Sequence, residues 1–172
     1  MISKLNIMTI VKDHISTLEA KNGDKWKDIV VFYAFPLILG LLFLYFKIKL
    51  SDSSVETLIT AGTLFAGLLL SLLVLVFDQR NKLSGKQDDA SVKIRTALYE
   101  LFSNISYAVL ISITLIIASF VQQIVCQDHP SNTPITIKIS IANAILAFLS
   151  SHLLLTVLMI LKRINLAITA DV

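Results

Sequence analysis

The fold is decided by residues 57–77, which read TLITAGTLFAGLLLSLLVLVF and comprise 21 residues without one charged side chain. Three further uncharged runs, of 18, 27 and 23 residues, occupy residues 29–46, 101–127 and 139–161. A transmembrane helix needs roughly 20 mainly apolar residues to cross about 30 Å of hydrocarbon. The sequence therefore predicts an all-α polytopic membrane protein with four transmembrane helices in a bundle. We expect these helices at about residues 29–48, 57–78, 101–126 and 139–161.

The composition argues against a soluble protein. Of the 172 residues, 55% are hydrophobic and 16% are charged, whereas soluble domains average roughly 25% charged residues. A soluble four-helix bundle would show a polar face on each helix, but the four runs are apolar nearly all round. The N-terminal stretch turns polar after about ten residues, which argues against a cleaved signal peptide.

The basic residues predict the orientation in the membrane. Of the 15 Lys and Arg residues, 12 lie in residues 1–28, 78–100 and 162–163, and 3 lie in the other two connections. Because cytoplasmic loops carry an excess of Lys and Arg, we expect both termini and the helical loop 78–100 to be cytoplasmic. No basic stripe interleaved with aromatic residues is present, so we expect no direct binding to nucleic acid. The predicted organisation is a cytoplasmic segment (1–28), a transmembrane domain (29–163) and a cytoplasmic tail (164–172).

The segment before the first span predicts an amphipathic helix. Apolar residues at helical spacing occur at Ile7, Val11, Ile15 and Leu18, and His14 is the one polar residue among them. Asn22-Gly23 is a suitable helix end, and Trp26 between two lysines is typical of an interfacial anchor. We expect this helix to be a surface helix, to lie on the inner leaflet, or to pack against a partner.

The connections predict which helices are neighbours. The outer connection LSDSSVE (50–56) is short, so spans one and two are expected to be antiparallel neighbours. Pro36 and Gly40 predict a kink in the first span. Residues 90–125 lack Gly and Pro and predict one helix, capped by Asp88 or Asp89. The single cysteine, Cys126, is expected to be free, and an intermolecular disulfide is the alternative.

The sequence offers no catalytic constellation. No Asp, Glu, Lys or Arg lies in the four apolar cores, which argues against an ion-coupled carrier or a small multidrug transporter. Neither Cys-x-x-Cys nor His-Glu-x-x-His occurs. Ser151 and His152 are adjacent on a helix and point about 100° apart, so they form no local nucleophile–base pair. We therefore predict that the chain is not an enzyme and holds no cofactor or metal.

Small residues at helical spacing predict close helix packing. Within lipid, helices associate through close backbone approach and through polar side chains that bond across helices. The predicted packing or oligomer-interface residues are Gly62, Ala66, Gly67, Ser71, Ala144, Ala147 and Ser151. We expect a homo-oligomer, with a tetramer favoured. The residues expected to face a cytoplasmic partner are Arg80, Lys82, Lys93 and Arg95.

One ionisable residue, His152, lies inside the fourth run. It is about nine residues, or about 13 Å, from the inner end of that span, which is close to the bilayer midplane. We expect it to point inward, toward Ser112 or span two, as a hydrogen-bonded packing residue. A pore-facing histidine is the alternative, and a metal site is less favoured. Asn143 and Gln122 are further candidates for buried polar or pore-lining residues.

Two segments resemble a known group of proteins. Residues 62–83, GTLFAGLLLSLLVLVFDQRNKL, and 95–113, RTALYELFSNISYAVLISI, carry the likeness. They resemble small four-helix membrane subunits and effectors of bacterial anti-phage defence, such as the membrane subunit of Kiwa-type systems. The resemblance implies an inner-membrane homo-oligomer that senses envelope attack or disrupts the membrane, together with a cytoplasmic protein partner from the same operon. A small channel or holin-like pore and a non-conducting structural subunit remain as alternatives.

Overall fold

The computed structural model describes residues 7–17, 25–83, 85, 88–127 and 137–169, and the regular secondary structure of these residues is helical throughout. In chain order the helices are α1 (Ile7–Thr17), α2 (Lys25–Tyr45), α3 (Asp52–Lys82), α4 (Asp89–Gln127) and α5 (Ile137–Thr169). The predicted all-α fold, with a helix before the apolar bundle, is confirmed. The predicted helix end at Asn22-Gly23 and the side chains of Trp26 and Cys126 lie outside the described part of the chain.

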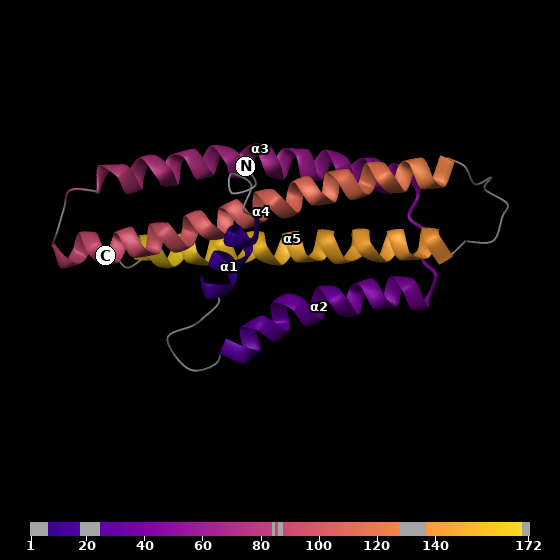
Figure 1. Ribbon diagram of the computed structural model, residues 1–172, viewed down its shortest axis with the longest axis horizontal. Coiled ribbons are helices and arrows are strands. Elements are labelled where there is room, and N and C mark those ends of the chain that lie inside the picture. The colour runs from indigo at the N-terminus through magenta and orange to yellow at the C-terminus, as the bar shows by residue number, and fades with distance from the viewer. Residues whose placement is uncertain (1–6, 18–24, 84, 86–87, 128–136, 170–172) are drawn as a thin grey trace.

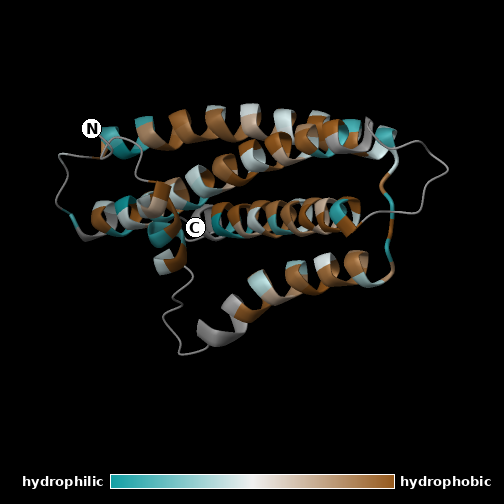
Figure 2. Cartoon of the chain, turned by 45° about the vertical axis from the view of Figure 1, so that its right-hand side comes forward, coloured by the Kyte–Doolittle hydropathy of each residue, from teal (hydrophilic) through white to brown (hydrophobic). Residues whose placement is uncertain are grey.

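Three of the described helices contain segments long and apolar enough to cross a membrane. These segments are Asp52–Lys82 in α3, Ser91–Ile124 in α4 and Ile137–Asn165 in α5. The apolar segment of α2 is shorter, Val30–Tyr45. Figure 2 shows hydrophobic residues along most of the length of these helices. Large apolar side chains are exposed on their surfaces, for example Leu68 (68%), Ile117 (59%) and Leu154 (59%), where a soluble protein would be polar. The chain is therefore a helical membrane protein.

Local signals explain where the helices begin and end. Ser51 precedes α3, and its hydroxyl accepts a hydrogen bond from the Ser54 amide at 3.1 Å. Asp88 caps α4 as predicted, because its carboxylate accepts from the Ser91 amide at 3.0 Å. α2 continues through Pro36 to Tyr45, and Lys47, just beyond its end, lies in the left-handed region (φ 49°). The Ile48 amide then bonds back to the Phe43 carbonyl at 3.1 Å, as in a Schellman motif.

The four long helices lie in a row in the order α3, α4, α5, α2 (Figure 1). Among the described residues, α3 packs on α4, α4 on α5, and α5 on α2. The prediction that spans one and two are neighbours is therefore wrong, since α2 lies against α5 and not α3. The connection Phe46–Ser51 starts with a turn at Phe46 and Lys47 and continues to Ser51 without regular secondary structure. In Figure 1 it runs from the end of α2 past α5 and α4 to α3. A short connection therefore allowed a crossing over the ends of the intervening helices.

The first helix, α1, lies at the level where α2 and α5 diverge. α2 lies close to α5 near Tyr45 and separates from it toward Lys25 (Figure 1). α1 packs across α4 near this end. Its His14 is fully buried, with 0% of its surface exposed, whereas Met8 is 66% exposed. The expected surface helix thus packs on the chain's own membrane helices, and part of its apolar face remains outward.

Two glycines allow helices to approach closely. A Cβ atom on Gly40 of α2 would lie 3.0 Å from the backbone oxygen of Ala144 on α5. A Cβ on Gly62 of α3 would lie 3.0 Å from Ile116 Cγ1 on α4. A Cβ on Gly67 would meet nothing within 4 Å. The predicted small-residue positions therefore fall into two groups. Gly62 and Ala144 lie at contacts between helices of the chain, whereas Gly67 and Ser71, one turn apart, face outward.

Replacing Gly40 by leucine should destabilise the protomer, because the new Cβ meets a backbone oxygen that cannot rotate away. We expect a loss of about 1–3 kcal/mol in the free energy of unfolding. The control substitution Thr114→Leu, at an exposed position of α4, should change that free energy by less than about 0.5 kcal/mol. Reversible unfolding in mixed micelles, followed by circular dichroism, compares the two variants. Equal losses for both would contradict the assigned α2–α5 crossing.

Candidate functional site

The buried side of α1 is polar and bonds to α4. His14 Nδ1 lies 2.8 Å from Asn104 Oδ1, and Thr17 Oγ1 lies 2.7 Å from the same oxygen. Because an amide oxygen only accepts, the Nδ1–H of His14 is the donor. Asn104 has no exposed surface either. α1 is thus bound to α4 by a polar contact at the centre of its buried face.

A second histidine continues this contact into the bundle. The imidazole of His14 stacks on the Tyr107 ring, with centroids 3.9 Å apart and planes 6° from parallel. The Tyr107 hydroxyl lies 2.8 Å from Nε2 of His152, and Nδ1 of His152 lies 3.1 Å from the carbonyl oxygen of Phe32. A carbonyl only accepts, so His152 donates from Nδ1 and accepts at Nε2 from Tyr107. We call His14, Asn104, Tyr107 and His152 the histidine–tyrosine cluster, which connects α1, α4, α5 and α2.

An ion pair lies beside the cluster. Arg163 Nη1 on α5 is 2.7 Å from Glu100 Oε2 on α4. The Nη2 of Arg163 also donates to the Thr17 carbonyl oxygen at the end of α1. The last carbonyls of a helix have no partner within the helix and carry partial negative charge, so a guanidinium there is favourable. Arg163 therefore holds the end of α1 against both α4 and α5.

A separate polar contact lies near the other end of the row. Gln122 Nε2 on α4 donates to Asn143 Oδ1 on α5 at 2.7 Å. Asn143 Nδ2 donates in turn to the Ile48 carbonyl, 3.0 Å away, in the connection between α2 and α3. Gln122 and Asn143, both predicted as buried polar candidates, are thus brought together. They hold the connection between α2 and α3 against α5. They do not share a site with His152.

The partner predicted for His152 was wrong. The residue is buried, with 1% of its surface exposed, and it points inward. It bonds to Tyr107 and Phe32, whereas the Ser112 hydroxyl bonds to the Ala108 carbonyl of its own helix at 2.9 Å. The predicted depth of His152 was counted from the end of the apolar run 139–161, but the helix α5 continues beyond this run to Thr169. The α4 residue that contacts His152 is therefore Tyr107, five positions before the predicted Ser112, which is about 7.5 Å along the helix axis.

Sequence reasoning did not identify Glu100, Asn104 or Tyr107 as functional candidates. These residues lie four and three positions apart, so they share one face of α4. The spacing of these polar residues at the start of the apolar run 101–127 was the sequence signal for a polar face on this helix. It does not reveal the partner, because His14 is 90 positions away in sequence.

The geometry of the cluster suits contact rather than catalysis. Both ring nitrogens of His152 are engaged within the chain, which favours the packing interpretation over a pore-facing one. Among the described residues, no group of three or more His, Cys, Asp and Glu side chains lies close enough to hold a metal ion. His14 Nε2 and Asn104 Nδ2 are buried without a hydrogen-bond partner. Each such atom costs about 1–3 kcal/mol, so the docking of α1 combines favourable bonds with an opposing cost.

Burial lowers the pKa of His14 from its usual 6.5 to about 4. Desolvation is the main cause, and the positive charge of Arg163 acts in the same direction, whereas the bond to Asn104 opposes it. The unpaired Nε2 explains why the pKa is lowered, because a proton on Nε2 would have no acceptor. Docked α1 therefore carries a neutral His14 at pH 7.

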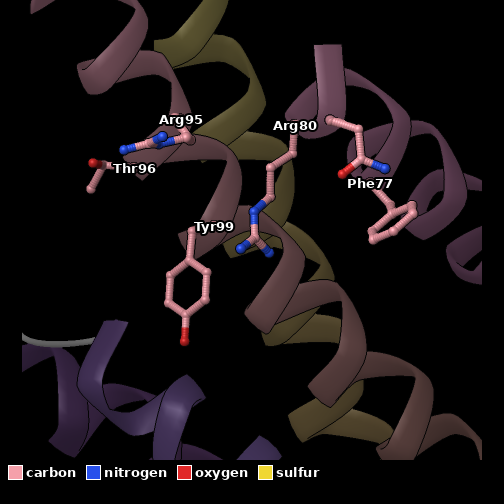
Figure 3. Close-up of a pocket in the computed structure, with 6 residues that line it drawn as sticks. Phe77, Arg80, Arg95, Thr96 and Tyr99 are labelled. Atoms are coloured by element: carbon pink, nitrogen blue, oxygen red, sulfur yellow. The ribbon is translucent and has the colours of Figure 1, made fainter. Parts of the chain in front are cut away.

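The basic residues expected to face a partner lie at the end of α3 and the start of α4. Arg80 and Arg95 line a pocket of about 490 Å³, together with Phe77, Asn81, Thr96 and Tyr99 (Figure 3). Lys82 pairs with Asp78 of its own helix at 2.9 Å, and Lys93 is exposed.

Comparison of the chain with protein-family models, with curated proteins and with solved structures gives no match.

The Tyr107–His152 hydrogen bond should be measurable as a coupling energy. Tyr107→Phe and His152→Leu, alone and combined, should show a coupling of about 1 kcal/mol in the free energy of unfolding. His152→Gln should be milder than His152→Leu, because an amide can still bond there. Ser112→Ala combined with His152→Leu serves as the control, with additive effects expected. A strictly additive Tyr107 cycle would contradict the assigned bond.

Acidification should release α1 from the bundle. The folded-state pKa of His14 is lowered, so its stabilising effect is complete above pH 6.5 and is lost as the pH falls toward 4. The total effect is about 3 kcal/mol. Spin labels at the exposed positions Lys12 and Lys162, in a Cys126→Ser background, should report a narrow distance distribution at pH 7.5 and a broad one at pH 5. His14→Gln should remove this pH dependence, and a wild-type distribution that stays narrow at pH 5 would refute the assignment.

Proposed function

We propose that this chain is a non-enzymatic subunit of a bacterial inner membrane that couples the state of its membrane helices to a cytoplasmic partner. The observation that carries the proposal is the histidine–tyrosine cluster. Through it, α1 contacts α4 directly, and Tyr107 passes the contact to His152 on α5 and to the Phe32 carbonyl on α2. A change in the packing of any of these helices alters the surface on which α1 rests.

The docking of α1 has the features of a two-state element. α1 has 11 residues, and isolated helices of that length are marginal in water, so α1 depends on its contacts for order. Two unpaired buried atoms and the requirement for a neutral His14 oppose docking. Movement of α4 against α5 in response to membrane perturbation then releases α1. The freed helix exposes its His14 face to a cytoplasmic partner.

The resemblance of residues 62–83 and 95–113 to small membrane subunits of anti-phage defence supports a role in sensing attack on the envelope. In this proposal the chain crosses the membrane four times, with α2 as the first pass and both termini in the cytoplasm. The distribution of Lys and Arg supports this orientation. The outward-facing Gly67 and Ser71 of α3 are the proposed contact between copies in a homo-oligomer.

The test uses the chain within its native operon, expressed in a phage-sensitive strain. We expect the wild-type operon to reduce phage plating by orders of magnitude. Asn104→Leu should abolish that protection, because it removes the acceptor of His14 and Thr17, while the protein still reaches the membrane. Thr114→Val on an exposed face of the same helix is the matched control and should protect like wild type.

Two results would count against the proposal. Protection by Asn104→Leu equal to wild type would show that α1 docking does not carry the signal. A wild-type operon that gives no protection against any phage would reject the defence role. Steady conductance of the purified chain in planar bilayers, unchanged in Asn104→Leu, would support the pore alternative instead.

A further inference from the structure

The inner ends of α3 and α4 change from apolar to charged at the same level. Phe77 is the last residue of the uncharged run in α3, and Leu101 is the first of the run in α4. The ring of Phe77 lies 6.5 Å from that of Phe102, so the two boundaries lie side by side. For helices that cross the membrane, this level marks the border between hydrocarbon and the lipid headgroups.

The pocket lined by Arg80 and Arg95 lies directly beyond this border. The guanidinium of Arg80 lies 5.5 Å from the centre of the Tyr99 ring, one turn from the Phe77–Phe102 pair. In Figure 3, Arg80 extends from α3 toward Tyr99, and Arg95 and Thr96 project from the preceding turn of α4. The cation–π contact with the ring favours this position of the Arg80 guanidinium.

The pocket is suited to an anion. Its described lining contains two guanidinium groups, an amide and two hydroxyls, and no carboxylate. The Thr96 hydroxyl already donates to the Val92 carbonyl of its own helix. The carboxylates that directly follow Phe77 and Tyr99 in sequence form ion pairs elsewhere, Asp78 with Lys82 and Glu100 with Arg163. Phe77 and Tyr99 are exposed at this level, as aromatic residues at membrane interfaces commonly are.

We propose that this pocket binds a phosphate group, supplied by the headgroup of an anionic phospholipid of the inner leaflet. Arginine matches the oxygens of a phosphate through its planar set of donors. Basic pockets between transmembrane helices on the cytoplasmic side bind such headgroups. The exposed Phe77 lies where the acyl chains begin. This site is distinct from the histidine–tyrosine cluster and goes beyond the proposed function, and its assignment to the inner leaflet rests on the orientation proposed there.

The test is native mass spectrometry of the full chain in mild detergent, titrated with phosphatidylglycerol. Arg80→Gln and Arg95→Gln should each weaken lipid retention about fivefold, and the double variant about 30-fold. Lys93→Gln removes an equal charge from the same region but not from the pocket, and should leave retention unchanged. Unaltered circular dichroism spectra and melting temperatures confirm that the variants fold. Equal retention by the double variant and wild type, or an equal loss with Lys93→Gln, would overturn the site.

A second arm identifies the source of the phosphate. The chain is placed in nanodiscs of phosphatidylcholine, and inorganic phosphate or ATP is added while the melting temperature is recorded. We expect no shift that depends on Arg80 and Arg95. An Arg80-dependent shift with either probe, without Arg80-dependent retention of phosphatidylglycerol, would reject the lipid headgroup as the ligand.

Discussion

A polar side chain buried among apolar helices must find its partner within the protein, because lipid offers none. In this chain the constraint acts at two levels of the row. At the end of the row near the connection between α2 and α3, Gln122 bonds to Asn143, and Asn143 bonds to the Ile48 carbonyl. Farther along the helices, Tyr107 bonds to His152, and His152 bonds to the Phe32 carbonyl. Each level joins α4 to α5 and α5 to the segment containing α2, so together they fix the order of the helices.

The remaining packing follows from that order. With α2 held against α5, Gly40 and Ala144 are brought together at a crossing that only a residue without a side chain permits. α2 diverges from α5 toward its start, and α1 packs on α4 at that end (Figure 1). His14 and Thr17 of α1 then supply the hydrogen bonds to the buried Asn104 oxygen, while Asn104 Nδ2 has no partner. α1 thus adds hydrogen bonds to the polar contacts of the membrane helices, and this dependence is the physical basis of the proposed coupling.

The sequence predicted the elements well and their partners poorly. Long uncharged runs define α3, α4 and α5 because crossing hydrocarbon imposes length and composition on each helix separately. The cap at Asp88 is equally local. Which helices pair depends on contacts between distant residues, such as His14 with Asn104, and no periodicity encodes these. His152 was located inside the bundle for a sound reason, since an ionisable residue in lipid must be satisfied, but its bond to Tyr107 required the register of two helices. The small-residue stripes likewise did not distinguish Gly62, which packs on α4, from Gly67, which faces outward.

Hydrogen exchange of the full chain in lipid nanodiscs tests the dependence of α1 on the buried cluster most directly. A free helix of 11 residues exchanges its amides rapidly, so protection within Ile7–Thr17 reports docking and little else. The account predicts clear protection of α1 in the wild type at pH 7.5. It also predicts that Asn104→Leu removes this protection while α4 and α5 remain protected. Rapid exchange of α1 in the wild type, or protection of α1 that survives Asn104→Leu, would contradict it.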